Sequence, residues 1–175
     1  MSHTLALLLL LLGRAAAPPK PLAGYNEVVV ERFAIEKSCE FSPLQSDAVQ
    51  QTAVSRLRAR KLVAVIDRLD AEGDELAKTP PAGGVKRMTM MATVVEFARG
   101  SRTARSISIG AGATKLRVRF TIKDAVTGAE LFTTERLGRY SGRFTGDGGG
   151  TNEAGFSAVA CEVVDGLIAE IEKNR

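Results

Sequence analysis

The stretch from Lys115 to Asp124 constrains the fold most, because apolar and polar side chains alternate along it without interruption. One side carries Leu116, Val118, Phe120 and Ile122, and the other carries Lys115, Arg117, Arg119 and Lys123. A period of two predicts a β-strand with one face in the core and one in water. The segment 124–128 that follows predicts a turn with a positive φ at Gly128, and 130–140 predicts the returning strand. The chain is therefore expected to contain an antiparallel hairpin within a one-sided sheet.

Two segments have the pattern of amphipathic helices. Ser42 precedes Pro43 and is followed three positions later by Gln45, which is a capping box with proline at the first helical position. The expected apolar face of this helix consists of Leu44, Ala48, Val49, Ala53 and Leu57. A second helix is expected from about residue 151, with an apolar stripe of Phe156, Val159, Val163, Val164, Leu167, Ile168 and Ile171.

The remaining segments predict three more strands and one loop. Residues 25–35, 62–67 and 88–98 are rich in β-branched and other apolar residues, which favours strands. The third of these is apolar on both faces, as expected of a central strand. Residues 70–84 are polar and end in Pro and Gly, so a mobile loop is expected there.

The expected order of elements is therefore β-α-β-β-β-β-α. A chain of 175 residues with 45% hydrophobic residues is enough for one core. The sequence predicts a single α+β domain over residues 25–175, a two-layer sandwich with a mostly antiparallel sheet and two helices on one face.

The N-terminus has the pattern of a targeting segment. Residues 5–12 form a run of eight apolar residues, too short to span a bilayer, and three alanines follow at 15–17. We assign residues 1–24 to a signal peptide and short linker, with cleavage after Ala17 or later, after Ala23 or Gly24. This predicts an exported protein of the periplasm or cell envelope.

Removal of the leader would also remove His3, the single histidine of the chain. The mature protein would then lack the usual general base, the Ser-His-Asp and Cys-His arrangements and most zinc sites. We therefore predict no enzyme activity, no metal and no cofactor. Cys39 and Cys161 match no zinc spacing, and two interpretations stay open for them: one disulfide, or two small buried hydrophobic side chains.

Positive charge is concentrated in one part of the chain. Residues 86–143 hold twelve Lys or Arg against four Asp or Glu, a balance of +8. One interpretation is a solvated strand face whose charges prevent edge aggregation. The other is a binding site for an anionic partner: lipid headgroups at the membrane surface, a cell-wall polymer or an acidic protein. Its candidate residues are Arg102, Arg105, Arg117 and Arg119. Export argues against nucleic acid as the partner.

An ordered set of motifs resembles a known family. The set is Glu96-Phe97-x-x-Gly100-Ser101-Arg102-x-x-Arg105, then Gly110-x-Gly112, then Asp124-x-x-Thr127-Gly128. It is similar to the bacterial domain-of-unknown-function family numbered forty-four ten, over roughly residues 25 to 172. The resemblance implies an envelope protein behind a signal or lipoprotein leader, and it supplies no catalytic residue. Tyr25 stands near the position of the lipidated cysteine of many members, so no lipid anchor is expected.

These observations favour a non-enzymatic exported envelope protein that acts as a binding or assembly module. One alternative is a self-assembling subunit whose exposed strand face is covered by a neighbour. Another is a hydrolase that uses carboxylates such as those of Glu96 and Asp124, since two positioned acids suffice for glycoside chemistry.

Overall fold

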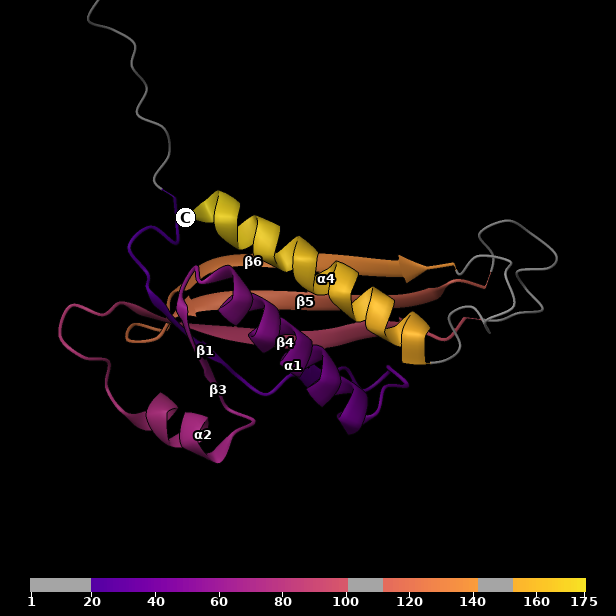
Figure 1. Cartoon of the computed structure of the whole chain (residues 1–175), viewed down its shortest axis with the longest axis horizontal. Helices are drawn as coiled ribbons and strands as arrows, with labels where there is room; N and C mark the ends of the chain where they lie inside the picture. The colour runs from indigo at the N-terminus through magenta and orange to yellow at the C-terminus, as the bar shows by residue number, and fades with distance from the viewer. Residues whose placement is uncertain (1–19, 101–111, 142–152) are drawn as a thin grey trace, which may run out of the picture.

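One mixed sheet organises the protein (Figure 1), and the computed structural model describes residues 20–100, 112–141 and 153–175. The strands follow the order β3-β1-β4-β5-β6, and β2 pairs with β4. β1 is parallel to both of its neighbours, whereas β4, β5 and β6 are antiparallel. The bounds of the strands are β1 Glu27–Val30, β2 Ala34–Ile35, β3 Ala64–Asp67, β4 Arg87–Ala98, β5 Thr114–Asp124 and β6 Glu130–Tyr140. The predicted α+β class with a mostly antiparallel sheet is confirmed.

Helix α1 (Pro43–Arg60) connects the parallel strands β1 and β3. Its capping box is confirmed, because the Gln45 N–H donates to Ser42 Oγ at 3.2 Å and the Ser42 N–H donates to Gln45 Oε1 at 3.1 Å. The buried residues of α1 are Ser46, Val49, Gln50, Ala53, Val54 and Leu57. The prediction that Leu44 belongs to the core face is wrong: it is 81% exposed, since at 100° per residue it lies on the opposite side of the helix.

The core lies between the sheet and two helices, α1 and α4 (Glu153–Asn174), which cover the same face. All four apolar positions of β5 are fully buried, so its predicted alternation is confirmed. β4 is central in the sheet but buried on one face only. Met88 and Met90 are fully buried, whereas Met91 is 44% exposed. The prediction of two covered faces is wrong for β4 because α1 and α4 lie on one side of it.

A third helix, α2 (Ala71–Lys78), replaces part of the predicted polar loop. The loop prediction is wrong there because local charge supports a helix. Glu72 and Asp74 lie in the first turn, where they suit the helix dipole, and Lys78 pairs with Asp74 four residues away. α2 lies beside β3 at the parallel end of the sheet (Figure 1).

The folded part of the chain begins upstream of Tyr25. Leu22 is fully buried, and its N–H donates to the carbonyl oxygen of Asn174 at 2.9 Å. Leu22 therefore packs with the domain, although its neighbours in residues 20–24 are exposed. The predicted signal peptide lies mostly in residues 1–19, outside the described residues, and stays a prediction. None of the described helices has the length and hydropathy needed to cross a membrane.

Candidate functional site

The side of β4, β5 and β6 that faces away from α1 and α4 is the candidate site, and we call it the open face. Strand alternation and the observed register place these residues on it: Thr89, Met91, Thr93, Glu96, Arg117, Arg119, Thr121, Lys123, Thr133 and Glu135. The predicted site residues Arg117 and Arg119 are thus neighbours on β5, as the alternation required.

Arg117 and Arg119 are engaged in a row of ion pairs across the three strands. Arg117 contacts Glu96 of β4 at 3.0 Å and Glu135 of β6 at 3.1 Å, and Arg119 contacts Glu135 at 3.2 Å. The hydrogen bond from Arg117 is the main cause that lowers the pKa of Glu135, and the same bond raises the pKa of Arg117. Two cations and two anions cancel, so the centre of the predicted basic face is electrically balanced.

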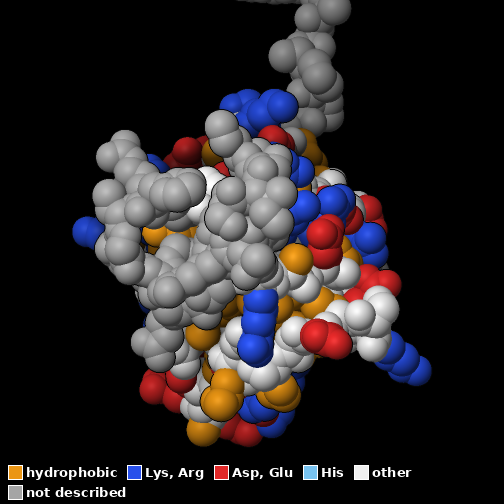
Figure 2. Space-filling model, turned by 90° about the vertical axis from the view of Figure 1, so that its right-hand side faces the viewer, with side chains coloured by type: hydrophobic (Ala, Val, Ile, Leu, Met, Phe, Trp, Pro, Cys, Tyr) orange, Lys and Arg blue, Asp and Glu red, His pale blue; other side chains and the backbone are white. Residues whose placement is uncertain are grey.

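Uncharged side chains lie beside this row. The Thr133 hydroxyl donates to Thr121 Oγ1 at 3.1 Å, and Met91 is nearly half exposed on the adjacent strand. Figure 2 shows the end of the molecule on the right of Figure 1, where the cationic and anionic side chains of the described residues lie among one another. A balanced, partly apolar centre of the open face suits contact with another protein surface better than capture of an anion.

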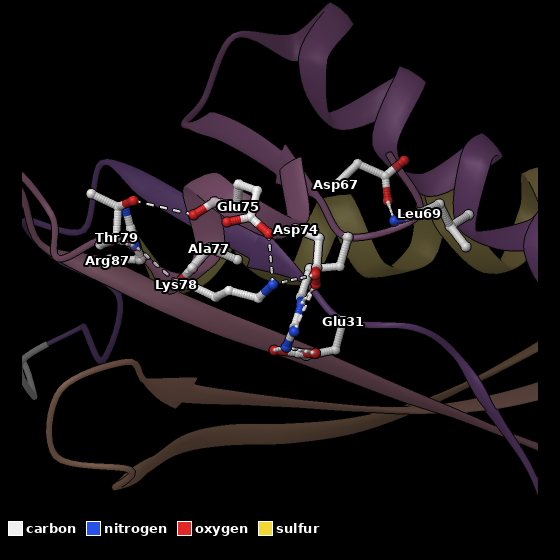
Figure 3. Close-up of polar contacts among 10 residues, drawn as sticks. Glu31, Asp67, Leu69, Asp74, Glu75, Ala77, Lys78, Thr79 and Arg87 are labelled. Carbon is white, nitrogen blue, oxygen red and sulfur yellow. Dashed lines mark hydrogen bonds and ion pairs between the residues drawn. The ribbon is translucent and has the colours of Figure 1, made fainter. Parts of the chain in front are cut away.

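A hollow of about 300 Å³ lies next to the open face, between the end of α2 and the β5–β6 turn. Arg87 is almost fully buried at its wall, where it pairs with Glu27 and donates to the carbonyl oxygen of Thr79 at 2.6 Å. Arg68 joins Glu31 at 2.8 Å and Asp74 at 2.7 Å. Figure 3 shows Arg87 beside Thr79 at the end of α2, and Glu31 near Asp74 farther along the helix. Of the charged side chains that line the hollow, Arg87 and Glu31 therefore serve to hold α2 on the sheet, whereas Lys78 pairs with Asp74 and Glu75 within α2.

The charged cluster around α2 was not predicted from the sequence. The signal was present, because Asp70 stands at the N-cap and Lys78 lies in the last turn of an eight-residue helix. The pattern was obscured because Gly73 interrupts the helix and few apolar residues mark its face. Gly73 is needed there: a Cβ at this position would lie 1.9 Å from the carbonyl oxygen of Asp67.

The other two candidate binding residues, Arg102 and Arg105, lie in residues 101–111, outside the described part of the chain. Their participation in a binding site stays a prediction.

The structure does not support a hydrolase based on Glu96 and Asp124. Asp124 pairs in register with Met88, eight residues along β4 from Glu96. At a rise of about 3.3 Å per residue the two acids are about 26 Å apart, beyond the separations of about 5–9.5 Å that glycosidases use. Asp124 is also occupied as an acceptor for the Tyr25 hydroxyl and for the N–H groups of its own turn. This alternative is wrong.

Among the described residues, no group of three His, Cys, Asp or Glu side chains could hold a metal ion.

Cys39 and Cys161 are free thiols in the structure, and both are partly buried. Cys39 lies beside Phe97 of β4, where burial raises the pKa of its thiol. Cys161 of α4 lies beside Arg56 of α1, and a hydrogen bond with Cys161 is the main cause that raises the pKa of Arg56. The structure therefore holds the two thiols in separate contacts, and a disulfide between them stays a prediction.

These features define a class, an α+β sandwich whose sheet has one face packed by helices and one open face. Its fold is shared by PelC from Paraburkholderia phytofirmans, solved as a dodecamer, with 19% identity over 89% of this chain and 93% of that chain and a TM-score of 0.59. A single-residue variant of PelC gives 18% identity over the same shares and a TM-score of 0.57. At these identities the similarity shows the fold alone.

Two further solved structures are similar. A hypothetical protein from Chlamydia trachomatis has 10% identity over 86% of this chain and 97% of that chain, with a TM-score of 0.54. A lipoprotein from Neisseria meningitidis has 12% identity over 82% of this chain and 99% of that chain, with a TM-score of 0.47. No family model and no curated protein matches the chain, so the family resemblance of the motifs stays a prediction.

Proposed function

We propose that this protein is a non-enzymatic, exported protein of a bacterial cell envelope and acts as an assembly module. Its open face would be covered by a neighbouring protein subunit. The row of ion pairs Glu96–Arg117–Glu135–Arg119 carries this proposal, because it cancels charge on a sheet face that α1 and α4 leave uncovered.

Two further observations support the proposal. PelC, which has the same fold, is a dodecamer. The apolar run at residues 5–12 predicts the export that an envelope protein needs.

The second candidate is binding of an anionic lipid or wall polymer, favoured by the balance of +8 over residues 86–143. An anion at Arg117 or Arg119 would have to compete with Glu96 and Glu135, which already neutralise them. Each such exposed pair is worth only about 0.2–1 kcal/mol, so competition is feasible but brings no large gain. For this reason a protein partner is the better fit to the open face.

Light scattering on the protein extracted from its envelope tests the proposal. We expect a particle larger than one copy, reduced in mass by Met91→Arg on the open face. Leu44→Arg is the matched control, because Leu44 is more exposed than Met91 but lies on α1, away from the open face. A single-copy particle with no protein bound in fixed ratio would contradict the proposal. Salt-sensitive binding to anionic vesicles, lost in Arg117→Glu with Arg119→Glu, would favour the second candidate.

A further inference from the structure

The two edges of the sheet differ in how their backbone groups are used. β3, at one edge, has only four residues. The carbonyl oxygens of Val65 and Asp67 point away from β1, and both accept hydrogen bonds, from the Arg58 side chain and from the Asp70 N–H. β6, at the other edge, is eleven residues long. A long regular edge strand presents unpaired backbone groups that can template another strand.

The direction of the free groups on β6 follows from one contact. The Arg139 N–H donates to the Glu162 carboxylate of α4 at 2.7 Å, so it faces away from β5. Because alternate residues of an antiparallel strand face the same neighbour, the N–H groups of Thr133, Glu135 and Leu137 face away from β5 too. Within the described residues, no hydrogen bond is made by these three N–H groups. The open length of the edge therefore ends just before Arg139.

We propose that β6 pairs antiparallel with β6 of a second copy, with Thr134 opposite Thr134 across a twofold axis. This inference rests on the proposed function and names one partner, a second copy of the chain. The pairing joins two sheets edge to edge, so the two open faces merge into one wider surface.

Charge and the blocked Arg139 exclude a shift of the centre toward the C-terminal end of β6, and Thr134 is the midpoint of residues 130–138, the part of the strand before Arg139. With Thr134 at the centre, Glu135 lies opposite Thr133 and Arg136 lies opposite Phe132, so no like charges meet. A shift of the centre to Glu135 would place two carboxylates directly opposite each other, which destabilises a strand pair. A further shift to Arg136 would require the Arg139 backbone, which Glu162 already occupies.

Proline at position 133 tests the pairing, because Thr133→Pro removes one outward N–H and leaves the bonds between β5 and β6 intact. Thr133→Ala is the matched control: it loses the same hydroxyl contact with Thr121 but keeps the N–H. Light scattering on the protein extracted from its envelope should show that Thr133→Pro lowers the particle mass to about half of the wild-type mass or below. Thr133→Ala should leave the mass unchanged. Leu137→Pro with Leu137→Ala provides a second pair of variants, should Thr133→Pro fail to fold.

Cross-linking tests the register independently. In the background Cys39→Ser with Cys161→Ser, Thr134→Cys should form a disulfide-linked dimer, because opposed non-hydrogen-bonded residues lie about 4.5 Å apart at Cα. Glu135→Cys should not, since the two copies of residue 135 would then be more than about 7 Å apart. A dimer formed equally by both variants, or by neither, would overturn the proposal.

The failures of the two proposals are distinguishable. If the particle stays oligomeric in the proline variants and loses mass only in Met91→Arg, the β6 pairing is wrong and the assembly function stands. If the extracted protein is a single copy without a bound protein, both are wrong.

Discussion

The Tyr25 hydroxyl donates a hydrogen bond of 2.6 Å to Asp124 Oδ2, across 99 positions of sequence. The contact ties the segment before β1 to the turn between β5 and β6. It lowers the pKa of Asp124 to about 2 and raises the pKa of Tyr25 to about 12, with the shared hydrogen bond as the main cause in both. The charged carboxylate and the neutral phenol are therefore the forms that the fold stabilises.

Tyr25→Phe should lower the free energy of unfolding at neutral pH by about 1 kcal/mol, the loss of one hydrogen bond to a partly exposed carboxylate. The contribution of Asp124 is complete above its unfolded pKa near 4 and is lost as the pH falls towards 2. The contribution of Tyr25 is complete below pH 10 and is lost as the pH rises towards 12. Denaturant unfolding of the wild type and of Tyr25→Phe at a series of pH values measures this difference in stability.

The control for this prediction is Tyr140→Phe, which changes the other tyrosine of the chain. Its difference from the wild type should not follow the same pH course. A stability difference for Tyr25→Phe that persists unchanged at pH 2 would contradict the assigned role of Asp124.

Gly138→Ala should destabilise the protein by about 3 kcal/mol or more, because overpacking of backbone against backbone cannot relax cheaply. A Cβ at position 138 of β6 would lie 2.4 Å from the carbonyl oxygen of Val159 in α4. Gly83→Ala is the control, since a Cβ there meets nothing within 4 Å. Thermal unfolding of the two variants compares them, and equal midpoints would show that α4 does not approach β6 so closely.

Gln50→Leu should cost about 2 kcal/mol, since it leaves the buried Phe33 N–H without a partner and removes one of the two hydrogen bonds to Asp67 Oδ1. Gln50 is fully buried on α1, where its Nε2 donates to Asp67 at 2.8 Å and its Oε1 accepts from the Phe33 N–H at 3.0 Å. Gln51→Leu, on the exposed side of the same helix, should change stability little. Chemical denaturation measures both, and a neutral Gln50→Leu would rule out this hydrogen-bonded link between α1 and β3.

Leu22→Ala should cost about 2–5 kcal/mol, the range for a fully buried leucine. Leu44→Ala makes the same chemical change at an exposed site and should be close to neutral. The comparison by thermal unfolding tests whether residues 20–24 belong to the folded domain. If both variants unfold alike, these residues are a linker, as the sequence suggested, and cleavage after Ala23 or Gly24 would leave the domain intact.

Local patterns predicted local structure well. The hairpin was predictable because strict alternation over ten residues and a glycine at the end of the turn both act within a short segment, and Gly128 does have a φ of +71°. The capping box at Ser42 was predictable for the same reason. α2 was not, because eight residues with a central glycine carry too little apolar signal to set against the nearby prolines.

Relations between distant segments were decided by tertiary structure. The sequence by itself determined which face of β5 carries Arg117 and Arg119, because strand geometry assigns every second side chain to one side. It could not determine that Glu96 and Glu135 would lie beside them, since neighbours across a sheet depend on the register of three strands. The parallel end of the sheet likewise depends on the crossover through α1. Whether a charge is free or paired is thus a property of the assembled sheet, because its electrostatic partners are set by spatial distance rather than by position along the chain.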